Sequence, residues 1–415
     1  MIPKRLLIYS HDSFGLGHLR RCRSIALSLV ARNPKLSVMI ISGLPLIARF
    51  GFHPQIHITL VPGIIKTDAG EYRALSTEHD IHEAIAQRSR IILETAQSFR
   101  PDMLLVDKEP LGVRGEVGAA LEWAQAHDVP MVLGLRDVMD EPSLLAREWA
   151  RKNAIAAIED YYHEIWVYGL PQIFDPLEGI ALSTEARQRV VFTSYLRRSD
   201  DDGAPDATLP DPVEPPFLLV TPGGGGDGER LVDWVLTALE HDRAIPHRIL
   251  IVSGPFMNAE RRARFEARAA LLPRVSMIDF VPGMERLMAS AAGVVAMGGY
   301  NTFCEILSFD KPALIVPRTT PRLEQFIRAS RAQTLGLVSM LVDDVEGAPQ
   351  PAPMAAALRR LPWLKRPSGV SIPGLLAGHE TIARRVEHWL GPVAAPGLAA
   401  DGLAGERRLG VRARE

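Results

Sequence analysis

Three glycine-rich segments carry residues whose types and spacing suit chemistry on a phosphate-containing ligand. The first runs from Ser10 to Arg21 and reads SHDSFGLGHLRR, with Gly15, Gly17 and His18 near its centre. Glycine lets the backbone turn tightly and lets a ligand approach closely. The start of a helix adds free N–H groups and a partial positive charge. A neutral histidine there can accept a proton from a hydroxyl group or water, so we predict that His18 is a general base. The alternative is that His18 is merely a first-turn residue.

A second segment, LVTPGGGGDG at positions 219–228, repeats the order of apolar run, glycine loop and helical pattern. Four consecutive glycines cost backbone entropy that a simple turn does not require, which favours close approach of a ligand. The Lys-Ser/Thr pair of a P-loop is absent, and Arg20 stands where a dinucleotide fingerprint needs its third glycine. We therefore favour neither a nucleoside triphosphatase nor a dinucleotide-binding enzyme. The candidate ligand-binding residues of this segment are Thr221, Gly223, Gly224 and Gly225.

The third segment has the most specific spacing. Gly298 and Gly299 end a predicted strand, and Asn301 and Thr302 begin a predicted helix, which gives another seat for a phosphate group. Glu305 follows within the same helix, and its carboxylate can accept hydrogen bonds from the two hydroxyls of a ribose. The spacing Thr302-x-x-Glu305 is also that of a capping box, so Glu305 could instead satisfy only the start of the helix.

The elements that must position these segments alternate along the chain. Short apolar runs predict strands at 5–10, 37–42, 56–61, 102–107, 130–135, 164–168 and 190–193. Amphipathic stretches at 18–32, 77–99 and 113–127 predict helices between several of them. Strands that are apolar on both faces and alternate with helices indicate a parallel α/β sheet.

The alternation breaks at 199–216, where SDDDGAPDATLPDPVEPP is acidic, rich in proline and without apolar periodicity, as expected of a linker. It then restarts, with strands predicted at 217–221, 248–253, 275–279, 293–296 and 313–316. Helices are predicted at 229–241, 259–271, 302–309, 322–334 and 380–390, and a disordered tail at 391–415. We therefore predict an α/β protein with two doubly wound parallel-sheet domains, 1–198 and 217–390, that face a cleft.

Composition excludes several classes of protein. The chain has 415 residues, 47% of them apolar, and a formal net charge of −2, so it is globular and carries no strong field for a nucleic acid partner. Its two cysteines, Cys22 and Cys304, cannot form a disulfide framework or a four-thiolate zinc site, which indicates a reducing compartment. No apolar run reaches the roughly 18 to 20 residues of a membrane span, and we expect a cytoplasmic protein.

Two basic stretches bear on contact with a membrane surface. One predicted helix places apolar and basic residues side by side, which is typical of an interfacial helix and equally of a core helix with a solvated basic face. Its residues are Leu144, Leu145, Trp149, Arg147, Arg151 and Lys152. The interfacial alternative would place the protein on the inner face of the membrane. A run of four arginines, at 261, 262, 264 and 268, is interpreted as an ordinary solvated face.

Together the three segments resemble glycosyltransferases of the GT-B fold, and most of all family 28, which includes the enzyme that adds N-acetylglucosamine to the lipid-linked precursor of peptidoglycan. The resemblance covers residues 5–390 in order and is strongest over 293–330. It implies that Glu305 holds the ribose of the donor, that Gln325 lies near the donor sugar, and that the helix start holds the diphosphate. The stretch from Asp12 to His18, followed by Arg20-Arg21-Cys22, is also similar to UDP-sugar hydrolases of sialic-acid-like sugar pathways.

The resemblance implies an enzyme that moves a sugar from a nucleotide sugar, a UDP-sugar in the first place, to an acceptor hydroxyl without a metal or other cofactor. The first domain would hold the acceptor and the second the donor. His18 is the first candidate base and Asp137 the second. Lys108–Gly112 and Gly134–Asp137 replace the family's acceptor-side sequences, so the acceptor, lipid-linked or polysaccharide, stays open. The alternatives are a UDP-sugar hydrolase or epimerase, and a non-catalytic nucleotide-sugar-binding protein.

Overall fold

The computed structural model describes residues 3–11, 16–44, 53–66, 72–75, 80–199, 216–224, 226–281, 283–343 and 350–391. Gly15, Gly225 and the predicted tail beyond position 391 lie outside these residues. So does the predicted linker, apart from its two end residues at 199 and 216. The expectations for these segments therefore stay predictions.

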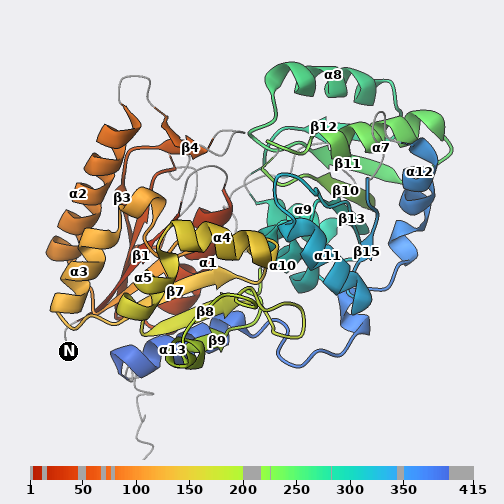
Figure 1. Cartoon of the computed structure of the whole chain (residues 1–415). Helices are drawn as coiled ribbons and strands as arrows, with labels where there is room; N and C mark the ends of the chain where they lie inside the picture. The colour runs from red at the N-terminus through yellow and green to blue at the C-terminus, as the bar shows by residue number, and fades with distance from the viewer. Residues whose placement is uncertain are drawn as a thin grey trace, which may run out of the picture.

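The N-terminal half is built on a seven-stranded sheet with the order β3-β2-β1-β6-β7-β8-β9, in which all neighbours are parallel (Figure 1). Its strands are β1 (Lys4–Tyr9), β2 (Leu36–Ser42), β3 (Ile56–Leu60), β6 (Met103–Asp107), β7 (Met131–Arg136), β8 (Glu164–Tyr168) and β9 (Val190–Phe192). Every strand predicted in this half is present. Because the strands are parallel, the carboxyl ends of β1, β6 and β7 meet at one edge of the sheet.

Helices connect these strands and cover both faces of the sheet. They are α1 (Gly17–Arg32), α2 (Ile81–Phe99), α3 (Gly118–Ala126), α4 (Pro142–Arg151), α5 (Ala154–Tyr161) and α6 (Thr184–Gln188), with a 3-10 turn at Val113–Gly115. A short antiparallel hairpin of β4 (Ile64–Lys66) and β5 (Tyr72–Ala74) was not predicted. Its strands have three residues each, too few to show a period in the sequence.

The C-terminal half holds a six-stranded parallel sheet with the order β12-β11-β10-β13-β14-β15. Its strands are β10 (Phe217–Thr221), β11 (Arg248–Val252), β12 (Val275–Ile278), β13 (Gly293–Ala296), β14 (Ala313–Ile315) and β15 (Ser339–Met340). Its helices are α7 (Glu229–His241), α8 (Ala259–Ala270), α9 (Met284–Ser290), α10 (Tyr300–Ser308), α11 (Glu324–Thr334) and α12 (Pro351–Arg360), with 3-10 turns at Leu361–Trp363 and Pro367–Gly369. The predicted fold of two doubly wound parallel sheets is confirmed.

The last helix, α13 (Gly378–Leu390), falls within the predicted second domain, 217–390, and contacts the N-terminal half. It packs on α1 and lies beside β8 and β9 of the N-terminal half (Figure 1). The indole N–H of Trp389 donates to Glu164 Oε1 at 3.0 Å, and Arg385 also binds the Glu164 carboxylate. The helix starts tightly against the first half, since a Cβ at Gly378 would lie 2.6 Å from the carbonyl oxygen of Tyr195.

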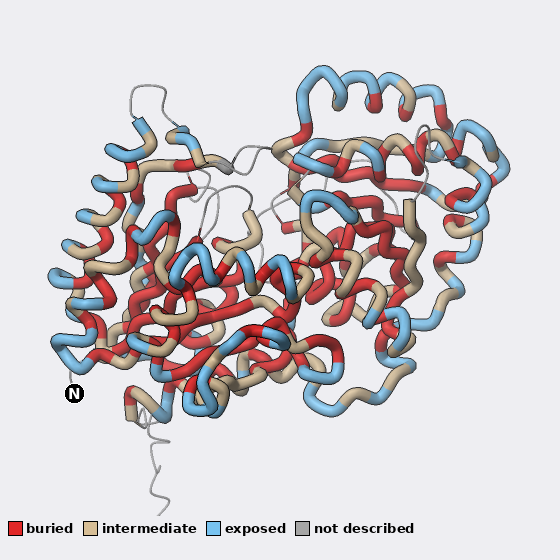
Figure 2. Tube along the Cα trace, viewed as in Figure 1, coloured by how far each residue is buried: buried red, intermediate tan, exposed pale blue. Residues whose placement is uncertain are grey.

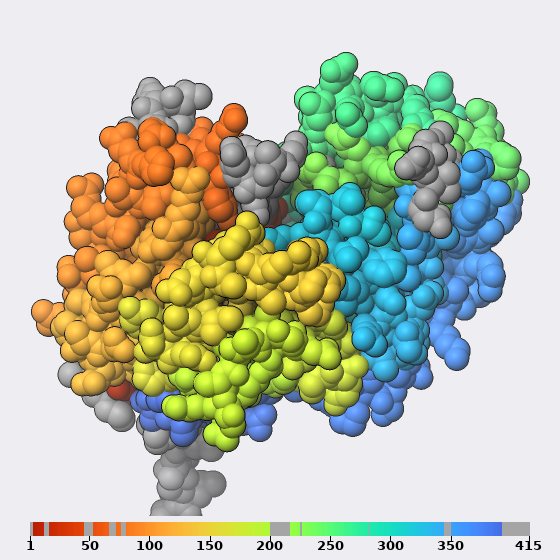
Figure 3. All heavy atoms as spheres, viewed as in Figure 1, coloured from red at the N-terminus to blue at the C-terminus, as the bar shows by residue number. Residues whose placement is uncertain are grey.

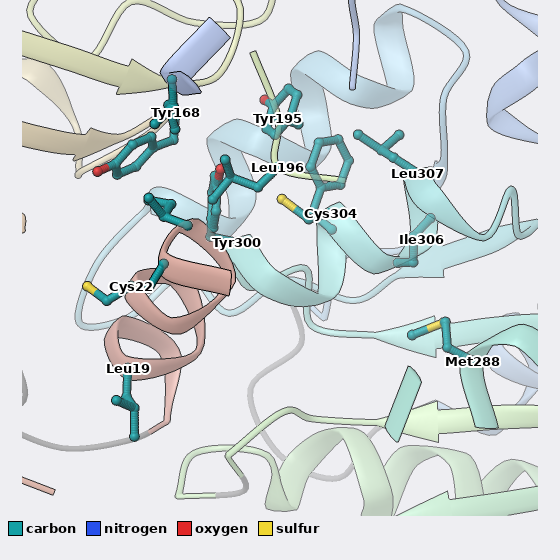
Figure 4. Close-up of a cluster of buried hydrophobic side chains, with 14 of the residues drawn as sticks. Leu19, Cys22, Tyr168, Tyr195, Leu196, Met288, Tyr300, Cys304, Ile306 and Leu307 are labelled. Atoms are coloured by element: carbon teal, nitrogen blue, oxygen red, sulfur yellow. The ribbon is translucent and has the colours of Figure 1, made fainter. Parts of the chain in front are cut away.

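One apolar core runs from the N-terminal sheet into the C-terminal sheet. The strands of both sheets are largely buried (Figure 2). Between them, the ring of Tyr195 lies 5.2 Å from that of Phe303 and 6.1 Å from that of Tyr300. The same cluster includes Leu19 and Cys22 of α1 and extends along α10 (Figure 4). The two halves therefore share a packed contact rather than only a covalent connection.

The structure shows which residues of the two basic stretches are buried and which are exposed or paired. In α4, Trp149 and Leu145 are buried in the core and only Leu144 is exposed, so the apolar face of this helix is already covered. The burial of Leu145 and Trp149 favours the interpretation of α4 as a core helix with a solvated basic face. Arg261, Arg262 and Arg268 of α8 each pair with an acidic residue, as a solvated face would. Among the described residues, no helix combines the length and the apolar character needed to cross a bilayer.

Candidate active site

The predicted glycine segments approach one another where the two halves meet. The surface is hollowed between the N-terminal half and the green part of the C-terminal half, and the halves are in contact below this hollow (Figure 3). The carboxyl ends of β1 and β6 lie on the N-terminal side of the contact, and α10 packs against α1 across it. This is the position expected of a ligand site in doubly wound sheets.

His18 lies in the first turn of α1 and contacts Asp107 at the end of β6. Its Nδ1 is 2.5 Å from Asp107 Oδ2. The Arg21 guanidinium binds both oxygens of Asp107 at 2.7 to 2.9 Å, and its Nη2 is also 2.9 Å from His18 Nδ1. An ionised carboxylate only accepts hydrogen bonds and a guanidinium only donates them, so the two contacts of Nδ1 make opposite demands on its proton. The contact with Asp107 is the shorter, at 2.5 Å against 2.9 Å, and it favours a proton on Nδ1 with Nε2 as the acceptor.

The protonation states of this pair follow from burial and charge. Burial lowers the pKa of His18 to about 3, although Asp107 beside it favours the charged form. Burial alone would raise the pKa of Asp107, but Arg21 and His18 lower it to about 2. A neutral imidazole that is oriented by a carboxylate, and whose Nε2 has no hydrogen-bond partner among the described residues, has the form of a general base. The side chain of His18 is 14% exposed, so it is not sealed in the core.

The sequence reasoning placed His18 and missed Asp107 and Arg21. Asp107 is the last residue of a strand that was predicted at 102–107, and the sheet order brings that strand beside β1. Arg21 stands three positions after His18, which is the spacing of neighbours on one face of a helix. Both signals were readable, but only the strand order shows that they converge.

Glu305 is buried in α10, where the predicted alternative role can be tested directly. The helix begins at Tyr300 with Gly299 as its N-cap, and no side chain caps it. Thr302 is therefore already inside the helix, and the capping-box alternative is wrong. The carboxylate of Glu305 instead accepts a hydrogen bond from Arg20 of α1. Burial raises the pKa of Glu305, with Arg20 opposing the rise and Glu285 adding to it.

The other residues of the third segment are held close to the N-terminal half. Asn301 Nδ2 donates to the carbonyl oxygen of Gly17 at 2.9 Å, and Asn301 Oδ1 accepts from Arg198 at 2.7 Å. Gly298 has a φ of +79°, and a Cβ there would lie 2.7 Å from Ile315, so glycine is required. A Cβ at Gly299 would meet no described atom within 4 Å, which leaves room within the described structure at the start of α10.

The second glycine segment follows β10. Gly223 has a φ of +89°, and its N–H donates to Thr221 Oγ1 at 3.2 Å. A Cβ at Gly223 would meet no described atom within 4 Å, whereas the carbonyl oxygen of Gly224 accepts from the N–H of Phe256 at 3.0 Å. Gln325 belongs to α11, where its Oε1 accepts from the N–H of Arg318 at 3.1 Å.

Asp137 does not have the form of a base. Its Oδ1 and Oδ2 are bound by Arg328 at 2.6 and 2.7 Å, and Oδ2 also accepts from the hydroxyl of Tyr195 at 2.8 Å. Both charged side chains are almost fully buried. A carboxylate engaged in this way joins the two halves, and we no longer expect it to take a proton from an acceptor.

Further ion pairs close the contact around these groups. Arg136, at the end of β7, binds Glu324 at 2.6 Å, and Arg322 of the C-terminal half binds Glu148 of α4 at 3.0 Å. Arg136 and Arg318 lower the pKa of Glu324 to about 2 although burial would raise it. No three His, Cys, Asp or Glu side chains of the described residues are grouped so as to hold a metal ion.

Comparisons with known proteins agree with this architecture. The model of the glycosyltransferase family 28 C-terminal domain matches residues 217–345. None of the curated proteins that were compared matches the sequence. Among solved structures, the calicheamicin glycosyltransferase CalG4 is 16% identical, with a TM-score of 0.57 over 94% of this chain and 100% of that one.

Two further structures extend the comparison. MurG of Acinetobacter baumannii is 14% identical, with a TM-score of 0.55 over 93% of this chain and 100% of its own. UGT2 of Phytolacca americana, solved with UDP-2-fluoroglucose and pterostilbene, is 14% identical, with a TM-score of 0.61 over 93% and 100%. At such identities the structures show the fold, and the family match shows the class of the second domain. The expectations of a GT-B fold and of a glycosyltransferase are therefore confirmed. Residues 217–345 match the glycosyltransferase family 28 C-terminal domain, within a chain that has the GT-B fold of glycosyltransferases.

Proposed function

We propose that the chain transfers a sugar from a UDP-sugar to the hydroxyl group of a hydrophilic acceptor, with His18 as the general base and without a metal. The observation that carries the proposal is the His18–Asp107 pair, whose 2.5 Å contact orients a neutral imidazole with no described partner at Nε2, in a chain whose residues 217–345 match the family 28 C-terminal domain. The neutral state is the one a base needs near pH 7, and the low pKa of His18 supplies it.

The transfer step is a substitution at the anomeric carbon of the donor. The acceptor oxygen forms a bond to that carbon while its proton moves to His18 Nε2. The bond between the anomeric carbon and the diphosphate oxygen breaks, and UDP leaves with the electron pair. Asp107 stabilises the imidazolium that forms, because its carboxylate already accepts the Nδ1 hydrogen.

The donor is proposed to lie on the C-terminal half. Glu305 would accept hydrogen bonds from the ribose hydroxyls, and Gln325 would lie near the sugar. The starts of the segments after β10 and β13 offer backbone N–H groups for the diphosphate, including that of Gly299. The UDP-sugar bound to the Phytolacca americana neighbour makes UDP the first nucleotide to test.

Charged side chains around the base favour a hydrophilic acceptor. Lys108 directly follows Asp107, and after burial and Arg21 its charge is a further cause that lowers the pKa of His18. Lys152 Nζ, from the end of α4, binds Glu109 at 3.1 Å and Glu148 at 2.6 Å. These charged surroundings suit a polysaccharide or the head group of a lipid-linked sugar better than they suit an apolar molecule. We expect the enzyme to be cytoplasmic, and to work at the inner face of the membrane if the acceptor is lipid-linked.

The donor can be identified by thermal unfolding in the presence of UDP-, GDP- and dTDP-sugars. A ligand present at 100 times its Kd stabilises the folded state by about 2.7 kcal/mol, which is a clear shift in Tm. We expect UDP-sugars to stabilise the protein most, in buffer that contains EDTA. Release of free sugar with no acceptor present would show that water is the acceptor, and the chain would then be a hydrolase.

The ribose role of Glu305 has its own test. Glu305→Ala should raise KM for the donor more than it lowers kcat, because an interaction common to ground state and transition state is lost. Glu266→Ala on α8 is the matched control, since Glu266 is exposed and, among the described residues, its ion pair is with Arg262 of the same helix. Unchanged UDP affinity in a folded Glu305→Ala variant would remove Glu305 from the donor site.

A further inference from the structure

Arg20 connects the helix that carries the base to the carboxylate proposed to hold the ribose. It stands two positions after His18 in α1 and reaches across the contact between the halves. Its Nη2 lies 2.6 Å from Glu285 Oε1 and also donates to Glu305 Oε1. Glu285 and Glu305 are both buried, and Arg20 holds both of them through one nitrogen atom.

The rest of this guanidinium is uncommitted within the described part of the chain. No described residue accepts a hydrogen bond from Arg20 Nε or Nη1, and the side chain is 20% exposed. On the other side of the contact, Glu305 Oε2 accepts no hydrogen bond from a described residue. Unused donors of a cation therefore lie next to an unused carboxylate oxygen.

The order of groups in a nucleotide sugar indicates which part of the donor would lie beside Arg20. The ribose and the anomeric carbon of such a donor are joined through two phosphate groups. If Glu305 holds the ribose and His18 faces the acceptor oxygen, the diphosphate must lie between them. Arg20 spans that interval, since its backbone is next to His18 in the helix and its guanidinium ends on Glu305.

Electrostatics points the same way. A diphosphate brought next to the carboxylates of Glu285 and Glu305 would be repelled unless a cation lay among them. The Nη1 atom of Arg20 carries two N–H groups that no described residue accepts, and a guanidinium N–H is a strong donor to a phosphate oxygen. When the bond to the sugar breaks, the leaving UDP gains negative charge, and a fixed cation at that point lowers the barrier.

We propose that Arg20 binds the diphosphate of the donor through Nη1 while Nη2 holds Glu305 in place for the ribose. The inference rests on the proposed function and adds a residue of the N-terminal half to the donor site. The donor site is then complete only when the two halves are in contact. Arg20 supplies the positive charge that the leaving diphosphate needs in a mechanism without a metal.

The test compares two ligands that differ only in the diphosphate. Uridine and UDP are titrated against the wild-type protein and the Arg20→Gln variant, with affinities measured by ligand-observed NMR, which reaches weak binding. We expect the variant to bind UDP about 10- to 100-fold more weakly, as for loss of hydrogen bonds to a charged group, and uridine within about threefold of wild type. Arg32→Gln is the matched control, because Arg32 is in the same helix and its partner, Glu380, is an exposed residue of α13.

Each other outcome would overturn a particular part of this proposal. Equal loss of uridine and UDP affinity would mean that Arg20 acts only by positioning Glu305, and tighter UDP binding would mean that Arg20 blocks the site. Either result overturns the diphosphate role while leaving the proposed function standing. Absence of UDP binding by the wild-type protein would overturn the proposed function and the role of Arg20 with it. If Arg20→Gln does not fold, the double variant Arg20→Gln, Glu285→Gln removes the excess buried charge and gives the same comparison.

Discussion

Two aspartates at neighbouring strand ends of the N-terminal sheet look alike in the sequence and differ in what they hold. Asp107 ends β6 and Asp137 directly follows β7, and each buried carboxylate is bound by one arginine through two nitrogen atoms. Their further partner differs. Asp107 contacts the partly exposed ring of His18, whereas Asp137 accepts from the fully buried hydroxyl-bearing side chain of Tyr195. Both aspartates lie at a strand end. The additional partner distinguishes Asp107, which orients the proposed base, from Asp137, which joins the two halves.

A single aromatic ring lies against both arginines. The guanidinium carbon of Arg21 is 5.5 Å from the centroid of the Tyr300 ring, and that of Arg328 is 5.9 Å from it. Such contacts add cation–π attraction to the ion pairs. Tyr300 is the first residue of α10, inside the predicted donor segment. The Asp107 and Asp137 pairs therefore both depend on the same residue of the C-terminal half, and closure of the halves supports both.

The largest expected effect comes from removal of His18, the partner of Asp107. His18→Ala should lower kcat for release of UDP from the preferred donor by about 10²- to 10⁴-fold, because the proton acceptor is lost. Steady-state kinetics at saturating donor measures this. His82→Ala on α2, an exposed histidine, is the control and should behave like the wild type. A kcat within about threefold of wild type would remove His18 as the base.

The contrast also shows where sequence reasoning ends. The sequence predicts the glycine segments, the position of His18 and the strands named above, because each is a local pattern of residue types. The partner of His18 could not, since Asp107 is 89 positions away and only the β1–β6 pairing brings it close. The roles of Asp137 and Arg20 depend on contact between the halves. Trp149 shows the same limit, because a buried helix and an interfacial helix have the same period.

The next largest effect concerns Asp137 and the stability of the folded protein. Asp137→Asn leaves Arg328 buried without its counter-charge, and we expect the free energy of unfolding to fall by about 3–5 kcal/mol. Denaturant unfolding followed by circular dichroism measures it.

A matched control tests the reason for that loss. Asp242 is bound by Arg359 through two nitrogen atoms at 2.7 Å each, in the same geometry, but the pair is on the surface. Asp242→Asn should therefore lower stability far less, since solvent screens the charge. Equal losses for the two variants would contradict the distinction that burial makes between these pairs.

The smallest effect concerns pH and sharpens the assignment of the base. A base acts in its deprotonated form, so its activity is lost as the pH falls through its pKa. Because burial lowers the pKa of His18 to about 3, kcat should change less than about twofold between pH 8 and pH 5. An acid limb centred near the ordinary histidine pKa of about 6.5 would contradict the buried, neutral state of His18.

The same lowered pKa values affect stability in a fixed direction. His18 and His379 both have pKa values of about 3, lowered mainly by burial, so the unfolded chain takes up protons that the folded protein excludes. Their contribution to stability is complete above about pH 6.5 and is lost progressively as the pH falls towards 3. Between pH 7 and pH 5.5 we expect a loss of about 1 kcal/mol for each histidine, measured by denaturant unfolding. A free energy of unfolding that does not fall over this range would contradict it.

The most direct test of the central claim compares Asp107→Asn with Asp137→Asn in the same assay. The quantity measured is kcat for UDP release at saturating donor, at a temperature where both variants are folded. We predict that Asp107→Asn slows the reaction by about 10²-fold, because the tautomer of His18 is no longer fixed, and that Asp137→Asn stays within about threefold of wild type. The reverse order, or equal effects, would contradict the assignment of the chemistry to the His18–Asp107 pair.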